Sequence, residues 1–161
     1  MVARDAVGVG LLGLGTIGTG VVRVLQRNAA LISERLGFGL RLVRIADLET
    51  SRDRGVSLEG IRFDSDADGL VEDPAVEIVI ELIGGYDAAR RLTLKALAAG
   101  KPVVTANKAL LAVHGNEIFA AARRAHLDVA FEASVGGGIP ILRSVREGFA
   151  ANRIESLHGI V

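Results

Sequence analysis

Short runs of apolar residues alternate along the chain with segments of helical periodicity. Consecutive apolar and β-branched residues predict strands, and apolar residues recurring every three or four positions predict helices. Strands are predicted over 6–12, 40–46, 76–83, 102–106 and 127–131, with a further strand beginning within 153–161. Helices are predicted over 16–36, 88–99, 116–125 and 139–150, the last of them starting at Pro140.

The order of these elements predicts the fold class. Strands and helices alternate, which favours an α/β protein with a Rossmann-like, doubly wound, mostly parallel sheet and helices on both faces. The run 76–83 is almost entirely apolar, which is typical of a strand buried on both faces. The polar segment 51–73 interrupts the pattern and ends before Pro74, so no regular element is expected there.

Composition narrows the classes of function. The 161 residues are enough for one domain with a substantial core, and half of them are apolar. The formal net charge is zero, which argues against nucleic acid and against electrostatic membrane binding. The uncharged stretch 6–22 is rich in glycine and too short for a membrane span. The absence of cysteine excludes disulfides and thiolate chemistry and favours a cytoplasmic location.

The segment "GVGLLGLGTIG" matches the dinucleotide-binding pattern G-x-G-x-x-G twice, once from Gly8 and once from Gly13. The pattern requires a strand before it and a helix opening at its last glycine. Only the match made by Gly13, Gly15 and Gly18 meets both requirements. Gly8 and Gly10 then belong to the strand, where a glycine is tolerated if a neighbour packs tightly.

Each glycine of the second match has an expected task. Gly13 makes the tight turn, Gly15 lets the backbone approach a pyrophosphate, and Gly18 lets the helix pack close to the strand. The free N–H groups near Thr16 and Ile17 would face the phosphates. The alternative is a tight turn that binds nothing.

Asp47 directly follows the second predicted strand. Its carboxylate could accept the ribose hydroxyls of a dinucleotide, or it could cap the turn between strand and helix. Arg52 and Arg54 lie close behind it and could serve a 2′-phosphate instead. The choice between NAD and NADP stays open at this point.

Residues that could bind a cofactor or take part in catalysis follow two further predicted strands, 76–83 and 102–106. Gly84 and Gly85 would let a loop pass close to the nicotinamide, or they form an ordinary turn. Lys108 could act as a base or steer an oxyanion, or it is a solvated charge at a helix start. Glu81 lies in an apolar strand and needs a hydrogen-bonding partner if it is buried.

The glycine-rich segment after the strand 127–131 is a third candidate. It contains three consecutive glycines followed by Pro140, and such a loop exposes carbonyl and N–H groups to a ligand or an ion. The alternative is a hinge leading out of the domain. The segment "DSDADG" resembles the first half of a calcium loop, but Ala75 stands where the bidentate Glu is required, so a solvated loop is expected.

Taken together, "GLLGLGTIGTGVV", "VVTANKALLA" and "FEASVGGGIPIL" resemble the homoserine dehydrogenase family, in order and over nearly the whole chain. The resemblance implies oxidation of homoserine to aspartate semialdehyde, or the reverse reduction, in the biosynthesis of threonine and methionine. It also implies NAD or NADP as cofactor and a homodimer when the protein is full length. The acid directly after the strand leans slightly towards NAD.

The resemblance also assigns residues. It implies that Lys108 lies beside the nicotinamide and the substrate, as a catalytic and cofactor-binding residue. It further implies that Gly13, Gly15, Thr16, Ile17 and Gly18 hold the pyrophosphate. With the strand-end candidates Asp47, Gly84 and Gly85 added, the expected cofactor-binding residues are Gly13, Gly15, Thr16, Ile17, Gly18, Asp47, Gly84, Gly85 and Lys108. Many family members hold a sodium ion by carbonyl oxygens, and the matching positions are Glu132, Val135, Gly137 and Ile139.

The end of the chain departs from the family, which continues into a substrate domain. We expect a dinucleotide-binding domain over 1–139, and a connecting helix and first strand of a truncated substrate domain over 140–161. Such a chain alone is expected to bind dinucleotide with little turnover, because the orientation of both reactants is lost. The alternatives are a non-catalytic NAD(P)-sensing Rossmann module and a structural piece with a vacant pocket.

Overall fold

The computed structural model describes residues 5–156, 158 and 159. Its strands are β1 (Ala6–Leu12), β2 (Gly39–Ala46), β3 (Arg62–Asp64), β4 (Ile78–Glu81), β5 (Val103–Thr105) and β6 (Val129–Ala130). Its helices are α1 (Thr16–Arg27), α2 (Ala29–Leu36), α3 (Ala67–Glu72), α4 (Asp87–Ala98), α5 (Lys108–Ala125), α6 (Glu132–Val135), α7 (Ile141–Arg143) and the π-helix η1 (Ser144–Gly148). No helix within the described ranges is long and apolar enough to cross a bilayer.

The strands form one parallel sheet in the order β3-β2-β1-β4-β5-β6. The chain therefore starts in the middle of the sheet, builds outwards to β3, and then returns to add β4 beside β1. This doubly wound α/β topology confirms the predicted fold class. In such sheets the ligand crevice lies at the carboxyl ends of the strands where the order reverses, which here means the ends of β1 and β4.

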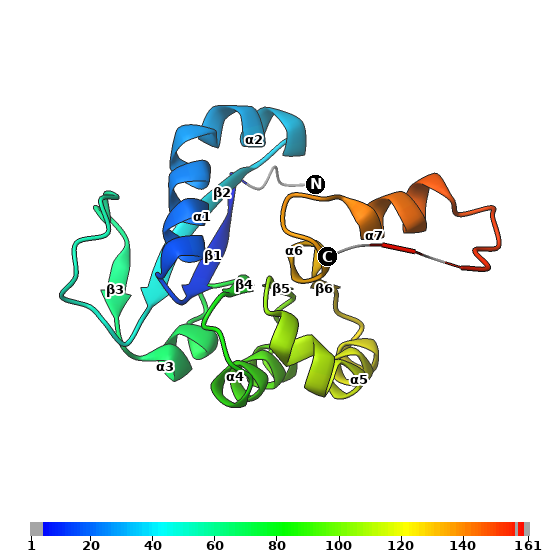
Figure 1. Cartoon of the computed structure of the whole chain (residues 1–161). Coiled ribbons are helices and arrows are strands. Elements are labelled where there is room, and N and C mark those ends of the chain that lie inside the picture. Colours follow the sequence, from blue (N-terminus) through cyan, green and yellow to red (C-terminus); the bar gives the residue numbers. More distant parts are fainter. Residues whose placement is uncertain (1–4, 157, 160–161) are drawn as a thin grey trace.

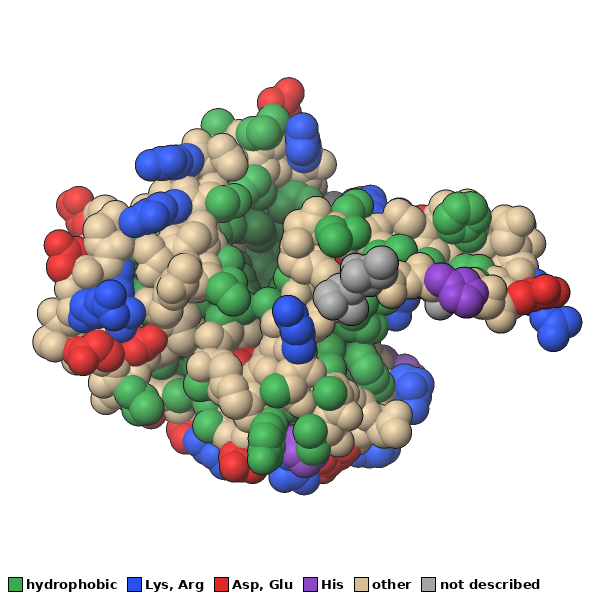
Figure 2. All heavy atoms as spheres, in the orientation of Figure 1, with side chains coloured by type: hydrophobic (Ala, Val, Ile, Leu, Met, Phe, Trp, Pro, Cys, Tyr) green, Lys and Arg blue, Asp and Glu red, His purple; other side chains and the backbone are tan. Residues whose placement is uncertain are grey.

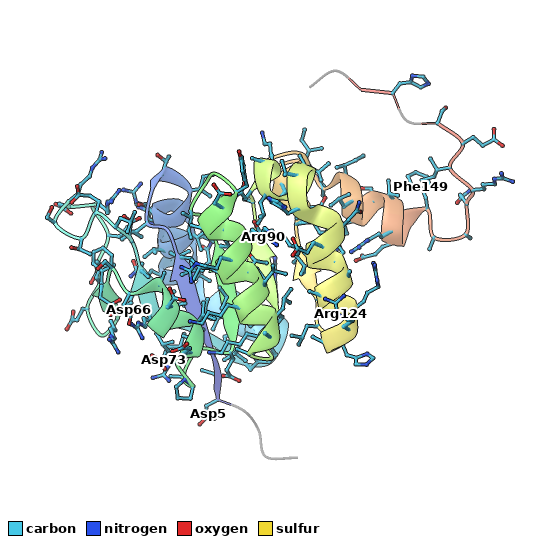
Figure 3. All side chains as sticks on the ribbon, turned by 90° about the horizontal axis from the view of Figure 1, so that it is seen from below. Asp5, Asp66, Asp73, Arg90, Arg124 and Phe149 are labelled. Carbon is cyan, nitrogen blue, oxygen red and sulfur yellow. The ribbon has the colours of Figure 1, made fainter. Side chains whose placement is uncertain are left out.

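Helices cover the two faces of the sheet unequally. Figure 1 shows α1 and α2 against one face and α3, α4 and α5 along the other. Figure 3 looks onto the second layer and labels Asp66 and Asp73 at the two ends of α3. Successive residues of β1 serve the two layers, since Leu11 belongs to the core under α1 and Leu12 to the core under α4 and α5.

The end of the sheet formed by β4 and β5 is covered more fully on one face than on the other. Val79 is fully buried beneath α4, whereas Ile78 and Ile80 on the opposite face are half-buried, and Val104 of β5 is exposed. On that face α6 contacts β5, and Ile80 packs against the core under α1, so the described strand is fully buried on one face and half-buried on the other. The expectation that the strand 76–83 is buried on both faces is met only in part. Figure 2 shows a hollow there between α1 and α6, with hydrophobic side chains inside it.

Two glycines of β1 allow a neighbouring segment to approach closely. A Cβ atom on Gly8 would lie 1.8 Å from the carbonyl oxygen of Ala75, and one on Gly10 would lie 2.7 Å from the side chain of Leu70. Any side chain at these positions would push α3 and the start of β4 away from the sheet. The interpretation of Gly8 and Gly10 as strand glycines under tight packing is confirmed.

Several helix bounds differ from the predictions. The helix expected over 16–36 is divided at Asn28, whose backbone (φ −107°, ψ 15°) is not helical. The segment 51–73, expected to be irregular, contains β3 and α3. Asp66 caps α3 by accepting a hydrogen bond from the Gly69 N–H, and Leu70 and Val71 bury its inner face.

The C-terminal half shows two further differences. The helix α5 begins at Lys108 rather than at residue 116, because the Asn107 side chain caps it at the Leu110 N–H. The helix expected over 139–150 is present as α7 and η1. The strand expected within 153–161 is absent from residues 153–156, 158 and 159, and residues 157, 160 and 161 lie outside the described part.

Candidate functional site

The glycine loop connects β1 to α1 at the centre of the crevice. Gly13 has a positive φ of 94°, and a Cβ there would lie 2.7 Å from the Leu82 carbonyl oxygen. A Cβ on Gly18 would lie 2.1 Å from the Gly13 carbonyl oxygen, so only glycine lets α1 start this close to the strand. The expected tight turn and close helix packing are confirmed, while the part of both residues in ligand binding stays a prediction.

Gly15 differs from these two glycines. No heavy atom lies within 4 Å of the position of its Cβ, and its backbone is extended (φ −71°, ψ −159°). The fold therefore does not require glycine here. A glycine that faces open space at the start of a helix suits a group that binds from outside.

The first turn of α1 offers donors to such a group. No side chain caps the helix, and no hydrogen bond within the described ranges engages the N–H groups of Thr16 and Ile17. Together with the space above Gly15, these donors fit the pyrophosphate of a dinucleotide, since a helix N-terminus attracts anions.

Asp47 lies beside the loop at the end of β2. Its Oδ2 accepts the Leu14 N–H at 2.5 Å, and its Oδ1 accepts the Glu49 N–H at 2.8 Å. The guanidinium of Arg54 lies 3.5 Å from Oδ1. Asp47 thus caps its own turn, as one of the two interpretations held, and it also tethers the glycine loop. Its binding of ribose hydroxyls is not tested by these contacts.

A cavity of about 400 Å³ joins the glycine loop to the loops that follow β2, β3 and β4. Gly13, Gly15 and Asp47 line one side of it, and Asp68 and Arg91 line the other. Hydrogen bonds from Arg91 (Nη1, 2.6 Å) and Lys95 (Nζ, 2.6 Å) lower the pKa of Asp68 to about 2. The ion pair of Asp68 with Arg91 adds charged groups to the cavity lining, and no motif in the sequence predicts them.

A second cavity, of about 460 Å³, lies at the β6 edge of the sheet. Phe119 and Arg123 of α5, Phe131, and Arg146 of η1 are among the residues that line it. None of the predicted site residues lines this cavity, and it lies away from the carboxyl ends of β1 and β4. The first cavity is therefore the better candidate for the ligand.

The loop after β4 and the start of α5 meet at the same edge of the sheet. Gly84 and Gly85 have positive φ values of 83° and 66° and open space around them. The Asn107 side chain donates to the Gly85 carbonyl oxygen at 2.7 Å, and Lys108 is the next residue. Asn107 therefore links the loop of Gly84 and Gly85 to the start of α5, directly before Lys108. The part of these residues in binding a nicotinamide stays a prediction.

Lys108 is exposed, and no hydrogen bond or ion pair of the described part engages its amino group. A free ammonium group at this place can hold an oxyanion or pass a proton to a bound molecule. The catalytic role of Lys108 remains a prediction.

Glu81 has the partners that its burial demands. Its carboxylate is fully buried and accepts hydrogen bonds from the Thr105 hydroxyl (2.6 Å), the Ile83 N–H (2.9 Å) and the Asn107 amide (3.4 Å). The Ser134 hydroxyl donates to the Thr105 carbonyl oxygen at 2.9 Å and so joins α6 to the same network. The predicted need of Glu81 for hydrogen-bonding partners is confirmed, and the partners lie on β5 and in the loops after β4 and β5.

The loop that follows β6 contains the four positions expected to hold sodium. The Glu132 carboxylate is not directed to an ion, because it accepts the backbone N–H groups of Leu142 (2.8 Å) and Arg143 (3.1 Å) at the start of α7. No group of three or more His, Cys, Asp or Glu side chains among the residues described is placed to hold a metal. Any ion here would depend on carbonyl oxygens.

The carbonyl groups of this loop are compatible with that use. Within the described residues, those of Val135 and Gly137 accept no hydrogen bond, and those of Glu132 and Ile139 accept one backbone N–H each. A carbonyl oxygen has two lone pairs, so all four can still donate to a cation. Oxygen ligands suit a hard ion such as sodium.

Comparison with known proteins places this geometry in context. A family model described as "Homoserine dehydrogenase, NAD binding domain" matches residues 13–132. The chain is 49% identical over 153 residues to the homoserine dehydrogenase of Pseudomonas aeruginosa, which covers 95% of this chain and 35% of that protein. It is 48% identical over 155 residues to the homoserine dehydrogenase of Neisseria gonorrhoeae, covering 96% and 35%.

A solved structure of a homoserine dehydrogenase from Thiobacillus denitrificans superposes with a TM-score of 0.87 at 48% identity. The superposition covers 95% of this chain and 35% of that one. The chain thus spans 35% of the length of each of these three relatives.

Proposed function

The chain belongs to the homoserine dehydrogenase family, within that family's NAD-binding domain, and on this premise we propose that it is the nucleotide-binding portion of an NAD(P)-dependent homoserine dehydrogenase. The reaction is the oxidation of L-homoserine to L-aspartate 4-semialdehyde or its reversal, a step of threonine and methionine biosynthesis. One observation carries the proposal. The glycine loop, Asp47, Gly85 and Lys108 all lie at the carboxyl edge of one sheet, around the ends of β2, β1, β4 and β5.

Different residues of the crevice would bind different parts of the dinucleotide. The N–H groups of Thr16 and Ile17 and the space above Gly15 would hold the pyrophosphate. Asp47 would face the ribose of the adenosine, and the loop of Gly84 and Gly85 would lie along the nicotinamide side. A bound nicotinamide would supply the group that exchanges hydride with the alcohol carbon.

Lys108 would act on the substrate oxygen. Its ammonium group is exposed and unengaged in the described part, so it is free to hold the homoserine hydroxyl and to take part in moving its proton. The remaining groups that orient homoserine are expected in the part of the relatives that this chain does not span.

The finer assignments rest on the family resemblance and on single features of the chain. Carbonyl oxygens at Glu132, Val135, Gly137 and Ile139 would hold sodium, because each keeps a free lone pair. Residues 1–139 would form the dinucleotide-binding domain. Residues 140–161 would lead to a substrate domain, which is supported by the way α7 and η1 project from the sheet (Figure 1). A cytoplasmic homodimer is proposed for the longer protein.

Two assays test the proposal. NADH and NADPH are titrated into the chain by fluorescence, and homoserine oxidation is measured with this chain and with a longer one. Binding together with activity only in the longer chain supports the proposal. Dinucleotide binding without homoserine oxidation in either chain would favour a non-catalytic NAD(P)-sensing module. If neither NADH nor NADPH bound, the chain would have a structural role only.

Replacement of Lys108 by Met tests the role of this side chain in homoserine oxidation. Because the side chain has no partner among the described residues, the fold and the affinity for the pyrophosphate end should stay unchanged. The kcat for homoserine in the longer chain should fall about 100-fold or more, as expected for a lost proton-transfer group. An unchanged kcat would contradict the role of Lys108.

A further inference from the structure

The buried network around Glu81 is larger than the packing of β4 requires. A carboxylate in an apolar strand costs free energy unless donors surround it, and an apolar side chain would fill the same space without that cost. Glu81 nevertheless has three donors: Ile83 from the loop after β4, Thr105 from the last position of β5, and Asn107 from the loop that follows β5. The carboxylate therefore holds the two loops at a fixed distance.

Asn107 uses every polar atom of its side chain in this linkage. Its Nδ2 donates to the Glu81 carboxylate and to the Gly85 carbonyl oxygen, and its Oδ1 accepts the Leu110 N–H at 3.0 Å. Its own N–H donates to the Thr105 hydroxyl at 3.0 Å. Asn107 thus joins the first turn of α5 to the loop of Gly84 and Gly85.

The loop depends strongly on this one side chain. The bond from Asn107 is the only hydrogen bond that Gly84 or Gly85 makes within the described ranges. Both glycines have positive φ values and no atom near their Cβ positions, so neither packing nor a second bond fixes the loop. Without Asn107, the peptide at Gly85 would have many orientations.

We propose that Asn107, held in place by the buried carboxylate of Glu81, is the positioning residue for the nicotinamide half of the dinucleotide. It sets the Gly84–Gly85 loop on one side of that half and the backbone of Lys108 on the other. The ADP half depends on other contacts, namely the glycine loop and Asp47. This inference rests on the proposed function, since it presupposes that the crevice binds a dinucleotide.

The test compares two ligands that share the ADP half. One is NADH or NADPH, whichever the chain binds more tightly. The other is ADP-ribose, or its 2′-phosphate if NADPH is preferred, which lacks the nicotinamide. Replacement of Asn107 by Ser keeps a good cap for α5 but is too short to reach Gly85 or Glu81. The ratio of the two dissociation constants then reports on the nicotinamide half alone.

Asn107→Ser should weaken the binding of the reduced dinucleotide about tenfold, the expected effect of one lost positioning hydrogen bond. The dissociation constant for ADP-ribose should change by less than about twofold. Glu81→Gln, which keeps the shape but removes the charge, should change the ratio in the same direction. The control is Thr93→Val on α4, which changes a buried polar side chain outside the Glu81 network. The Thr93 hydroxyl has no partner in the described part, so this variant should leave the ratio unchanged.

Two results would overturn the inference. Equal losses for both ligands in Asn107→Ser would show a general structural role, and an unchanged ratio in both variants would show that the nicotinamide half is held by other groups. A wild-type chain that binds neither ligand would instead overturn the proposed function itself, and the inference with it.

Discussion

The Asp47 carboxylate accepts a hydrogen bond from the Leu14 N–H at 2.5 Å, and so fastens the end of β2 to the glycine loop after β1. Its other oxygen caps the turn at Glu49. Asp47, for which ribose binding or turn capping was predicted, therefore also supports the glycine loop. One side chain thus links the end of β2 to the turn between β1 and α1.

Arg54 is predicted to influence the choice between NAD and NADP. Its guanidinium lies 3.5 Å from the Asp47 carboxylate and offsets the negative charge that would repel a 2′-phosphate. Arg54→Ala should lower the affinity for NADPH about tenfold and leave that for NADH nearly unchanged. The control is Arg35→Ala, which removes an exposed arginine from the last turn of α2, before β2 begins and away from Asp47. Equal losses of NADH and NADPH affinity in Arg54→Ala would contradict the prediction.

Gly15 is predicted to be required for the ligand and not for the fold. A Cβ at Gly15 meets no atom of the protein, so Gly15→Ala should keep the melting temperature of the wild type. The added methyl group would occupy the approach of the pyrophosphate and weaken dinucleotide binding about tenfold or more.

Gly20 of the same helix provides the matched control. It also has no atom within 4 Å of its Cβ position, and it lies inside α1 rather than at its start. Gly20→Ala should stabilise the chain by up to about 1 kcal/mol without changing affinity. If Gly15→Ala bound the dinucleotide as tightly as Gly20→Ala, the assignment of the phosphate site would be wrong.

Asp68 is predicted to contribute to stability against acid. Its pKa is about 2 in the folded chain against an ordinary value of 3.8, because Arg91 and Lys95 donate to it. A depressed pKa stabilises the fold above pH 3.8, and this contribution disappears as the pH falls through 2. Asp68→Asn should lower the melting temperature at pH 7 by about 2 °C, a small value because the side chain is partly exposed.

The difference between wild type and Asp68→Asn should shrink between pH 4 and pH 2, as followed by thermal denaturation at a series of pH values. A difference that stayed constant down to pH 2 would mean that the ion pair with Arg91 and Lys95 does not form.

Arg44 is predicted to be the most sensitive charged residue of the fold. It is 3% exposed and pairs with Asp64 and Asp66 at 3.1 Å and with Asp73 at 3.6 Å. Arg44→Met would leave these carboxylates without their shared cation and should cost about 3 kcal/mol in the free energy of unfolding. Arg62→Met removes an exposed partner of Asp64 and should cost less than about 1 kcal/mol. If urea denaturation gave similar decreases in the free energy of unfolding for the two variants, the special importance of Arg44 would be contradicted.

Apolar patterning was sufficient to predict the central strands and the fold class. It failed where capping decides an element. The helix α5 starts at Lys108 because Asn107 caps it, although the apolar period is weak there and Val113 is exposed. The short elements β3 and α3 were missed because each buries few side chains, so their apolar signal is smaller than the polar character of the segment around them.

The site was predictable where chemistry is encoded in adjacent residues. Gly13 and Gly18 have the structural tasks that their spacing predicted, and Asn107, beside Lys108, bonds to Gly85. The partners of Glu81 were not predictable, because they follow from the parallel register that sets Glu81 beside Thr105. The pairing of Asp68 with Arg91 likewise depends on the packing of α3 against α4, which no local pattern specifies.

The central claim is that the crevice at the carboxyl ends of β1 and β4 binds a nicotinamide dinucleotide. The most direct measurement is an amide ¹H–¹⁵N NMR titration of the chain with NADH and with NADPH. We expect saturable chemical-shift changes of the amide groups of Gly15, Thr16, Ile17, Asp47 and Gly85. Shifts confined to the cavity lined by Phe119 and Arg146, or no shifts with either dinucleotide, would contradict the central claim.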